Sequence, residues 1–298
     1  MVGGTGFVGS HMAKACAGHY QITTSGREVD VRDYAQVHDL IRNTQPDDVV
    51  HLAAITTLRE SFSDPRTTYD VNFIGTLNVL MSLREVDFTG RILFVSSSEI
   101  YGRLGANDLP VSETRLPQPV SPYAVAKIAS EALCYQWSNL DKFKIVMARP
   151  FNHIGPGQSE RFSISDFGKQ VAMIKLGHAP PVISVGDIST TRDFTDVRDI
   201  VAAYVQLLDR GSNGEIYNVC SGIERTVRYL IERMCELFDL NVDIVTDISR
   251  FRASEQKRVF GSNDKLIAAT GWQSKFMIDQ TLTDIVEDWI DRLKSYAI

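Results

Sequence analysis

Hydrophobic and polar positions alternate along the first half of this chain in two ways. Short apolar runs, typical of buried strands, lie at 21–25, 47–53, 91–97 and 143–149. Amphipathic stretches of helical length lie between them, at 7–18, 33–44, 65–86 and 122–140. Strands that alternate with helices predict βαβ units, a parallel sheet and helices on both of its faces.

The pattern changes after Pro150, where residues 151–158 have the composition of a turn-rich loop. Beyond it the pattern predicts helices near 165–177, 196–209, 226–238 and 278–293, and short strands near 182–185, 216–219 and 242–246. We therefore expect an α/β protein. A doubly wound, Rossmann-type parallel sheet forms the dinucleotide-binding domain, residues 1–150, and a smaller α/β domain, residues 151–298, binds mainly substrate. Later strands and helices are expected to return to the first domain.

Composition narrows the class of protein. The 298 residues carry a formal net charge of −6, which argues against nucleic acid or an acidic membrane surface as a partner. No cationic leader and no apolar run of membrane-spanning length is apparent. The four cysteines form no C-x-x-C pair, so we expect reduced structural thiols in the cytoplasm and no metal site.

A glycine-rich loop opens the chain. Gly3, Gly6 and Gly9 precede and enter the first predicted helix, where glycine lets the backbone approach a pyrophosphate and the helix presents free N–H groups. A tight strand-to-helix turn would look the same, but the βα pattern that follows favours a dinucleotide site.

Only Met1 and Val2 precede the first glycine, although the strand before such a loop is usually central in the sheet and about 5–6 residues long. We therefore expect a truncated first strand. It reflects either a shortened or misplaced chain start or a notch in the sheet beside the cofactor site.

The choice between NAD and NADP depends on the end of the second predicted strand. An acidic residue usually binds the ribose there, but the sequence reads Ser25-Gly26-Arg27. The arginine fork suits a 2′-phosphate, which favours NADP(H). Glu28 and Asp30 lie close enough to keep NAD(H) possible, and Arg27 could also be a solvated surface charge.

Three polar residues suggest acid–base chemistry. Tyr123 and Lys127 lie four residues apart on one helical face, after a plausible helix start at Ser121-Pro122. The lysine charge is expected to lower the tyrosine pKa and make it a proton donor or acceptor. Ser97 ends a predicted strand, where open α/β sheets place ligands. Each feature alone would more often be structural.

Together the glycine loop, "HLAA" at 51–54, Ser97, Tyr123 and Lys127 resemble the extended short-chain dehydrogenase/reductases, which act on nucleotide sugars. The resemblance covers essentially the whole chain. It implies that Tyr123 is the catalytic acid/base, that Ser97 assists it and that Lys127 also binds the nicotinamide ribose. It further implies that the cofactor is lined by these two residues, Tyr123 and Lys127, and by Gly3, Gly6, Phe7, Gly9, Arg27, Asp30, Val31, Leu52, Ala53 and Ala54.

The second half resembles a narrower group, the reductases that convert GDP-4-keto-6-deoxymannose to GDP-D-rhamnose by reducing its C4 ketone. The resemblance rests on the segments 148–158, 185–204, 217–222 and 261–272. It implies that Asn152, Arg192 and Arg252 bind the nucleotide, while Glu255 accepts hydrogen bonds from the nucleoside. Two arginines would offset a diphosphate in an acidic protein, although either could form a surface ion pair. His153 reads as a structural loop histidine.

Alternatives remain at this point. Glu99 occupies the place where the related GDP-mannose 4,6-dehydratases carry a carboxylate base, although those enzymes run longer and have an arginine-rich loop where this chain has "IGPGQ". A nucleotide-sugar 4-epimerase would use the same triad, and a non-catalytic nucleotide-sugar-binding protein could share the fold. The resemblance also implies a homodimer through helices near 65–86 and 122–140.

Overall fold

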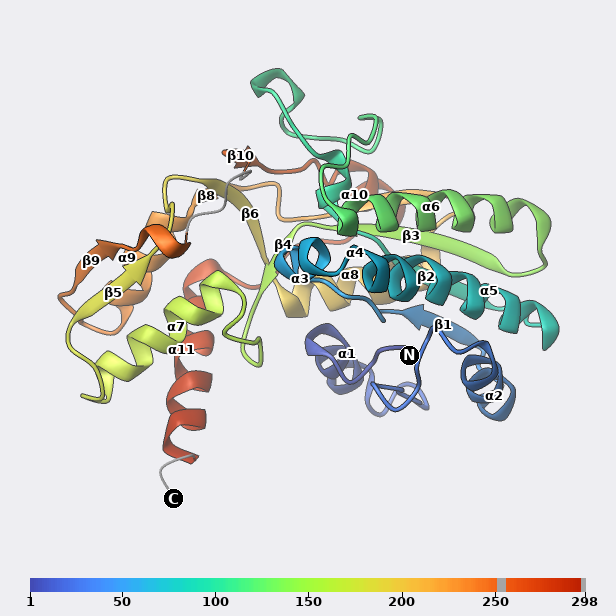
Figure 1. Cartoon of the computed structure of the whole chain (residues 1–298), viewed down its shortest axis with the longest axis horizontal. Helices are drawn as coiled ribbons and strands as arrows, with labels where there is room; N and C mark the ends of the chain where they lie inside the picture. The colour runs from blue at the N-terminus through green and yellow to red at the C-terminus, as the bar shows by residue number, and fades with distance from the viewer. Residues whose placement is uncertain (251–255, 296–298) are drawn as a thin grey trace.

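The computed structural model describes residues 1–250 and 256–295 (Figure 1). Its larger part contains α1 (Phe7–Cys16), α2 (Tyr34–Thr44), β1 (Asp48–His51), α3 (Leu58–Ser63), α4 (Pro65–Tyr69), α5 (Gly75–Glu85), β2 (Arg91–Val95), α6 (Pro122–Leu140), β3 (Lys144–Pro150), α8 (Val197–Arg210), β7 (Ile216–Val219) and α10 (Asp264–Thr270). The predicted parallel sheet is confirmed. Its strands run in the order β1-β2-β3-β7, so the second half of the chain contributes β7 to it.

The sheet continues beyond β1 through two isolated residues. Val2 forms parallel bridges with His51 of β1 on one side and with Ser25 on the other. The expectation of a very short first strand is confirmed. The predicted strand at 21–25 is wrong, because only Ser25 of that run joins the sheet. The neighbouring segment contributes a single paired residue, Val2.

The strands alternate their side chains between two helical layers. On one face Val49, Ile92, Phe94, Ile145 and Met147 pack into the cluster that contains residues of α2, α5 and α6. On the other face Val50, Leu93, Val146 and Ala148 pack into the cluster that contains residues of α1, α8 and α10. This period of two places helices on both faces, as a doubly wound sheet requires.

Two helical segments matched their predicted ranges closely. α6 begins at Pro122, where the Ser121 hydroxyl accepts a hydrogen bond from Ala124 N at 3.1 Å, and it ends at Leu140 as predicted. The predicted helix at 65–86 consists of α4, a π-helical turn over Asp70–Ile74 and α5. A π-turn inside an α-helix often marks a functional position.

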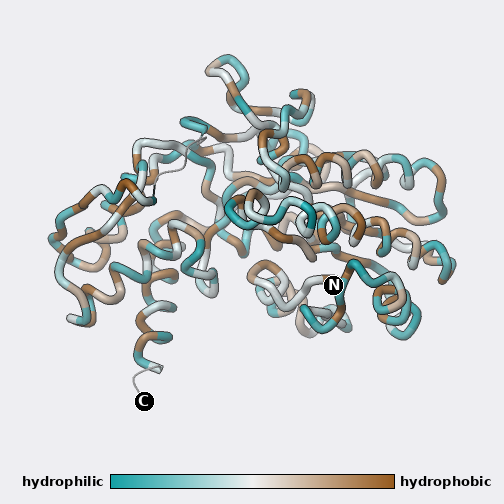
Figure 2. The backbone as a smooth tube through the Cα atoms, in the orientation of Figure 1, coloured by the Kyte–Doolittle hydropathy of each residue, from teal (hydrophilic) through white to brown (hydrophobic). Residues whose placement is uncertain are grey.

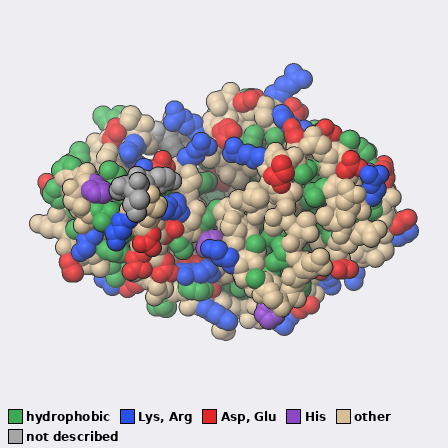
Figure 3. Space-filling view, turned by 90° about the horizontal axis from the view of Figure 1, so that it is seen from below, with side chains coloured by type: hydrophobic (Ala, Val, Ile, Leu, Met, Phe, Trp, Pro, Cys, Tyr) green, Lys and Arg blue, Asp and Glu red, His purple; other side chains and the backbone are tan. Residues whose placement is uncertain are grey.

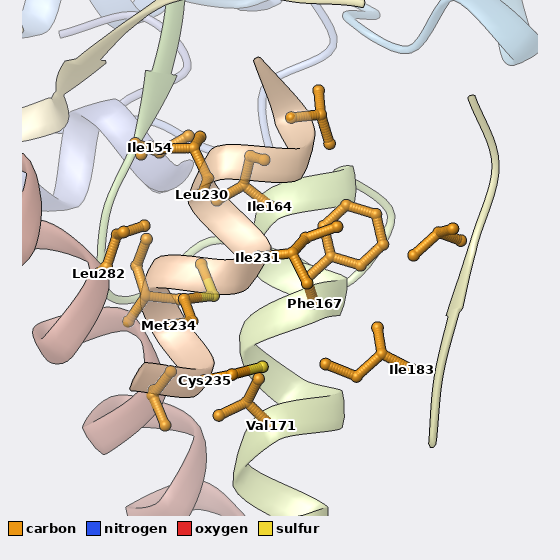
Figure 4. Close-up of a cluster of buried hydrophobic side chains, with 14 of the residues drawn as sticks. Ile154, Ile164, Phe167, Val171, Ile183, Leu230, Ile231, Met234, Cys235 and Leu282 are labelled. Atoms are coloured by element: carbon orange, nitrogen blue, oxygen red, sulfur yellow. The ribbon is translucent and has the colours of Figure 1, made fainter. Parts of the chain in front are cut away.

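The smaller part contains β4 (Asn152–Ile154), α7 (Ser163–Lys175), β5 (Val182–Val185), β6 (Thr191–Asp196), β8 (Glu224–Thr226), α9 (Val227–Leu237), β9 (Asp243–Thr246), β10 (Arg258–Val259) and α11 (Ile278–Ser295). Figure 4 shows the core between α7, α9 and α11, where Phe167, Val171, Leu230, Met234 and Leu282 pack together. β4 corrects the expectation that 151–158 is entirely loop, because its residues pair with β6, a strand far away in the sequence.

The surface agrees with the modest net charge. Figure 2 shows hydrophilic and hydrophobic stretches alternating along the helices, as expected for helices with one buried face. Figure 3 shows acidic and basic side chains interspersed on the face that it presents. Across the described part of the chain, the helices are too short or too polar to cross a membrane.

Candidate active site

The glycine loop has the close contacts that its glycines predict. Gly3 has φ +79°, and a Cβ there would lie 2.5 Å from the backbone nitrogen of Ala53. A Cβ on Gly9 would lie 2.2 Å from the carbonyl oxygen of Gly4. Gly6 is the N-cap of α1 and provides no side-chain hydrogen bond to the N–H groups of the first helical turn. This geometry suits an anionic diphosphate at the helix N-terminus.

The "HLAA" segment lies directly against that loop. Leu52 N and Ala53 N both donate to the carbonyl oxygen of Val2, at 2.8 and 3.0 Å. Leu52, Ala53 and Ala54 are half-buried at the carboxyl end of β1. They therefore stand where open α/β sheets bind ligands, as expected from the sequence.

The two carboxylates expected near the adenosine, Glu28 and Asp30, have partners within the chain. Arg27 is exposed, while Glu28 accepts a hydrogen bond from Gly26 N. Asp30 forms an ion pair with Arg32 whose shortest N–O distance is 2.6 Å, and hydrogen bonds from Arg32 lower the pKa of its carboxyl. The side chain of Val31 is buried in the core, so only its backbone could face a cofactor. The cofactor roles of these residues stay predictions.

The structure brings Ser97, Tyr123 and Lys127 to the carboxyl end of β2. Ser97 starts the 3₁₀ turn Ser98–Tyr101, and its hydroxyl accepts a hydrogen bond from Glu99 N at 3.2 Å. Lys127 is 3% exposed and donates through Nζ to the carbonyl oxygen of Val95 at 2.7 Å. Tyr123 is 7% exposed on the same face of α6. These three side chains come from two elements that the sequence separates by a loop of about twenty residues.

The expected lowering of the Tyr123 pKa by Lys127 is wrong for this structure. Burial raises the pKa of Tyr123 to about 12, the Glu99 charge acts in the same direction, and contact with the Ser97 hydroxyl opposes both. Burial also lowers the pKa of Lys127 to about 8. The spacing in the sequence could not reveal this, because the desolvation comes from the layers that close over α6.

Of the four residues expected to bind substrate, the structure describes two, one on β4 and one on β6. Asn152 is exposed at the start of β4. Arg192 lies on β6, and its Nη1 donates to the carbonyl oxygen of Thr191 at 2.7 Å. Arg252 and Glu255 lie outside the described residues. Glu99 is exposed on the 3₁₀ turn next to Ser97.

Three carboxylates lie close to Arg192 in the sequence, those of Asp193, Asp196 and Asp199, and each has hydrogen-bonding partners of its own. Asp193 accepts hydrogen bonds from Ser221 N and Gly222 N, both at 2.8 Å. Asp196 pairs with Arg198 at 2.7 Å. Asp199 accepts from Lys275 N and Phe276 N, at 3.0 and 3.1 Å. All three carboxylates therefore stabilise local structure.

Comparison with known proteins agrees with this geometry. Residues 17–285 match the model of the family described as GDP-mannose 4,6 dehydratase. A GDP-6-deoxy-D-mannose reductase from Pseudomonas aeruginosa is 40% identical over 297 residues, which cover 99% of this chain and 97% of that protein. The chain belongs to the extended short-chain dehydrogenase/reductase family.

Two further relatives are informative. A GDP-6-deoxy-D-talose 4-dehydrogenase from Aggregatibacter actinomycetemcomitans is 28% identical over 93% of this chain and 92% of that protein. The solved structure of RMD from Pseudomonas aeruginosa in complex with NADPH superimposes with a TM-score of 0.90, at 40% identity and 98% coverage of both chains. The family assignment and the α/β fold expected from the sequence are thus confirmed.

Sequence reasoning missed Asn72, which lies in the π-helical turn and is 1% exposed. Its side chain holds the loop that follows β1, residues 52–57, which we call the cofactor-side loop. Nδ2 donates to the Ile55 carbonyl oxygen at 3.0 Å, and Oδ1 accepts from Ile55 N at 2.8 Å. Its own carbonyl oxygen accepts from Ser130 of α6 at 3.0 Å and from Thr76 at 2.7 Å. The π-turn is invisible to a helical-period analysis, so the contacts of Asn72 emerged only from the structure.

Proposed function

We propose that this protein reduces the C4 ketone of GDP-4-keto-6-deoxymannose with NADPH and yields GDP-D-rhamnose. The observation that carries the proposal is the full-length similarity to a GDP-6-deoxy-D-mannose reductase, at 40% identity. The convergence of Ser97, Tyr123 and Lys127 at the carboxyl end of β2 supports it.

NADP(H) is the proposed cofactor. The similar structure from Pseudomonas aeruginosa contains NADPH, and here the close approach of Gly3 to Ala53 and the glycine-capped N-terminus of α1 suit a dinucleotide diphosphate. Exposed Arg27 is available for a 2′-phosphate. When bound, NADPH supplies the hydride.

The residues of the chain supply the proton and orient the substrate. Tyr123, with a pKa raised to about 12, is protonated at neutral pH and can donate its phenolic proton to the oxygen at C4. Lys127, with a pKa of about 8, is largely protonated there and stabilises the phenolate that remains. The Ser97 hydroxyl accepts from Glu99 N and contacts the Tyr123 hydroxyl, so the substrate oxygen can be bound where these two hydroxyls meet.

Substrate binding through Asn152, Arg192, Arg252 and Glu255 remains part of the proposal. Asn152 and Arg192 lie on paired strands, since Asn152 of β4 is in register with Phe194 of β6. They can therefore approach one nucleotide from adjacent positions. An arginine and an amide are suited to a diphosphate and its ribose.

A dehydratase is the main alternative, because the matching family description names that activity and Glu99 lies beside Ser97. The decisive experiment supplies purified protein with GDP-4-keto-6-deoxymannose and NADPH, and separately with GDP-mannose and NADP. We expect nicotinamide absorbance to fall in step with the formation of GDP-D-rhamnose in the first mixture. Consumption of GDP-mannose at constant absorbance would show dehydration instead, and a C4 epimer at constant absorbance would show epimerisation.

The oligomer is proposed to be a homodimer in the cytoplasm. Exposed apolar side chains gather on α3 to α6: Phe62, Tyr69, Ile74, Met81, Val125, Tyr135 and Leu140. A second copy could cover them through α5 and α6. All four cysteines are buried and free, which fits a reducing compartment. Sedimentation of Tyr135→Glu should show a monomer if this surface is the interface, while a dimer would contradict it.

A further inference from the structure

A buried polar network lies beneath the proposed active site and has no role in the chemistry described so far. It consists of the side chains of Tyr101, Glu131, Arg149 and Asn218, each no more than 3% exposed. Arg149 of β3 forms a two-pronged ion pair with Glu131 of α6, with Nε to Oε1 at 2.9 Å and Nη2 to Oε2 at 2.7 Å. The network therefore joins the central sheet to the helix that carries Tyr123 and Lys127.

The same guanidinium also reaches the segment that carries Ser97. Arg149 Nη1 donates to the Tyr101 hydroxyl at 3.0 Å, and that hydroxyl donates to Asn218 Oδ1 at 2.7 Å. Tyr101 ends the 3₁₀ turn that starts from Ser97, so only one short turn separates the two residues. The Tyr101 hydroxyl thus both donates and accepts a hydrogen bond, and these two bonds fix the end of the 3₁₀ turn.

Glu131 lies on the same face of α6 as Tyr123 and Lys127. Tyr123, Lys127 and Glu131 follow one another at intervals of four residues, so they lie on one face of the helix, which runs along β3 (Figure 1). Arg149 joins the last of them to the turn of Ser97. The bridge therefore links the elements that carry Ser97 and Tyr123 without contacting either of these two hydroxyls.

Asn218 extends the bridge to two further segments of the chain. Its Nδ2 donates to the carbonyl oxygens of Val111 at 3.0 Å and of Ser262 at 3.3 Å. Stability alone does not explain such an arrangement, since a buried ion pair can often be replaced by apolar residues without loss of stability. A fully hydrogen-bonded buried network does favour one geometry over others.

We propose that Arg149 is a positioning residue for the reduction: by joining Tyr101 to Glu131, it sets the separation of Ser97 from Tyr123. This inference rests on the proposed function. Misplacement of reacting groups by about 1 Å can cost about a hundredfold in rate, so the bridge has a measurable kinetic role.

The first variant, Tyr101→Phe, removes one hydroxyl and preserves the ring. We expect kcat to fall by about tenfold to a hundredfold, while KM for NADPH and for the sugar changes by less than about threefold. Tyr217→Phe is the matched control: Tyr217 is also buried, its hydroxyl accepts a hydrogen bond from Ser212 N at 3.1 Å, and it lies next to Asn218 on β7. It should lose stability to a similar extent and keep the wild-type kcat.

A second variant guards against misfolding. Glu131→Leu combined with Arg149→Met replaces the ion pair by apolar groups of similar size, which buried pairs often tolerate. We expect a thermal midpoint near that of Tyr101→Phe and a kcat reduced at least as much. A folded double variant with wild-type kcat would overturn the proposal.

A measurement without turnover separates this inference from the proposed function. In protein labelled with ¹³C at tyrosine Cζ, the Tyr123 signal can be assigned from its absence in Tyr123→Phe. We expect it to shift at neutral pH in Tyr101→Phe and to stay in place in Tyr217→Phe, because only the first variant alters the contact with Ser97. If the wild type fails to reduce the keto sugar, the proposed function is wrong and this signal still decides the role of Arg149. An unmoved signal would overturn that role.

Discussion

The two sides of the cofactor end of the parallel sheet are built very differently. On the side of the proposed catalytic residues, β1 pairs with β2 over four residues and β2 with β3 over five. On the side of the glycine loop, the sheet continues through Val2 alone. In the proposed function both sides hold a functional group in place, yet only one of them has an extended ladder of strand pairs.

The difference shows two ways of positioning a site. Ser97, Tyr123 and Lys127 are held by ladders, by a buried helix and by side-chain hydrogen bonds beneath them. The glycine loop is held by a few backbone hydrogen bonds of Val2 and by tight contact, since a Cβ on Gly3 would meet Ala53. We therefore expect changes on the first side to affect mainly turnover, and changes on the second side to affect stability and cofactor affinity.

The largest effect should come from Tyr123→Phe on the catalytic side. Loss of the phenolic proton donor should lower kcat by a factor of about 10² to 10⁴, because general acid catalysis contributes that much. Cofactor affinity and the thermal midpoint should change little, since the ring stays buried. Steady-state kinetics with NADPH and the keto sugar, together with fluorescence titration of NADPH, would check this. Unchanged turnover would show that Tyr123 is not the acid, whereas absence of turnover in the wild type would favour a binding protein.

The glycine-loop side can be tested with Gly3→Ala and the matched control Gly18→Ala. Both glycines have positive φ, +79° and +83°, but a Cβ on Gly18 would meet nothing within 4 Å. Backbone strain alone should cost Gly18→Ala about 1–2 kcal/mol of the free energy of unfolding. Gly3→Ala should lose clearly more and should also bind NADPH more weakly, because Ala53 must move. Equal losses in the two variants, measured by denaturant unfolding, would show that the contact with Ala53 carries no weight.

His51 lies where the two sides meet, since it pairs with Val2 and precedes the cofactor-side loop. Burial, reinforced by the charge of Lys127, lowers the pKa of His51 from 6.5 to about 3. Below pH 6.5 the unfolded chain therefore takes up a proton that the folded protein excludes. The free energy of unfolding should fall by about 1.4 kcal/mol for each pH unit between about 6 and 4.

His51→Gln should remove this part of the acid sensitivity, whereas His19→Gln, at an exposed position, should leave it. Urea unfolding at a series of pH values would measure both slopes. Identical slopes for the wild type and His51→Gln would mean that His51 is not held neutral in the folded protein.

The smallest effect should come from lengthening the first strand. Three β-branched residues added before Met1 could continue the ladder between Thr23 and β1, and each new backbone hydrogen bond should contribute about 0.5–1.5 kcal/mol. We expect a modest rise in the thermal midpoint and in NADPH affinity. A matched extension of three glycines should give neither, because glycine is a poor strand former. Equal behaviour of the two extensions would show that the notch does not weaken the loop.

Much of this fold was predictable from local patterns. The range of α6 follows from Ser121, Pro122 and an apolar period, and β5 and β7 from short β-branched runs bounded by turns. The strand predicted at 21–25 was wrong because a strand needs a paired neighbour, and only Val2 forms a bridge with this segment, at Ser25. β6 and β4 were not predicted as strands because their pairing joins residues about forty positions apart, which no local pattern encodes.

The sequence by itself determined the type of chemistry: the glycine spacing, the four-residue interval from Tyr123 to Lys127, and a serine at a strand end follow from residue order and helical period. The tertiary structure alone decided how those groups behave. Burial raised the Tyr123 pKa, whereas the sequence predicted a lowered one. Asp30, expected near the adenine, forms an ion pair with Arg32. Arg149 joined residues from three separate elements. Desolvation and long-range hydrogen bonds depend on which segments meet, and that is settled only when the chain has folded.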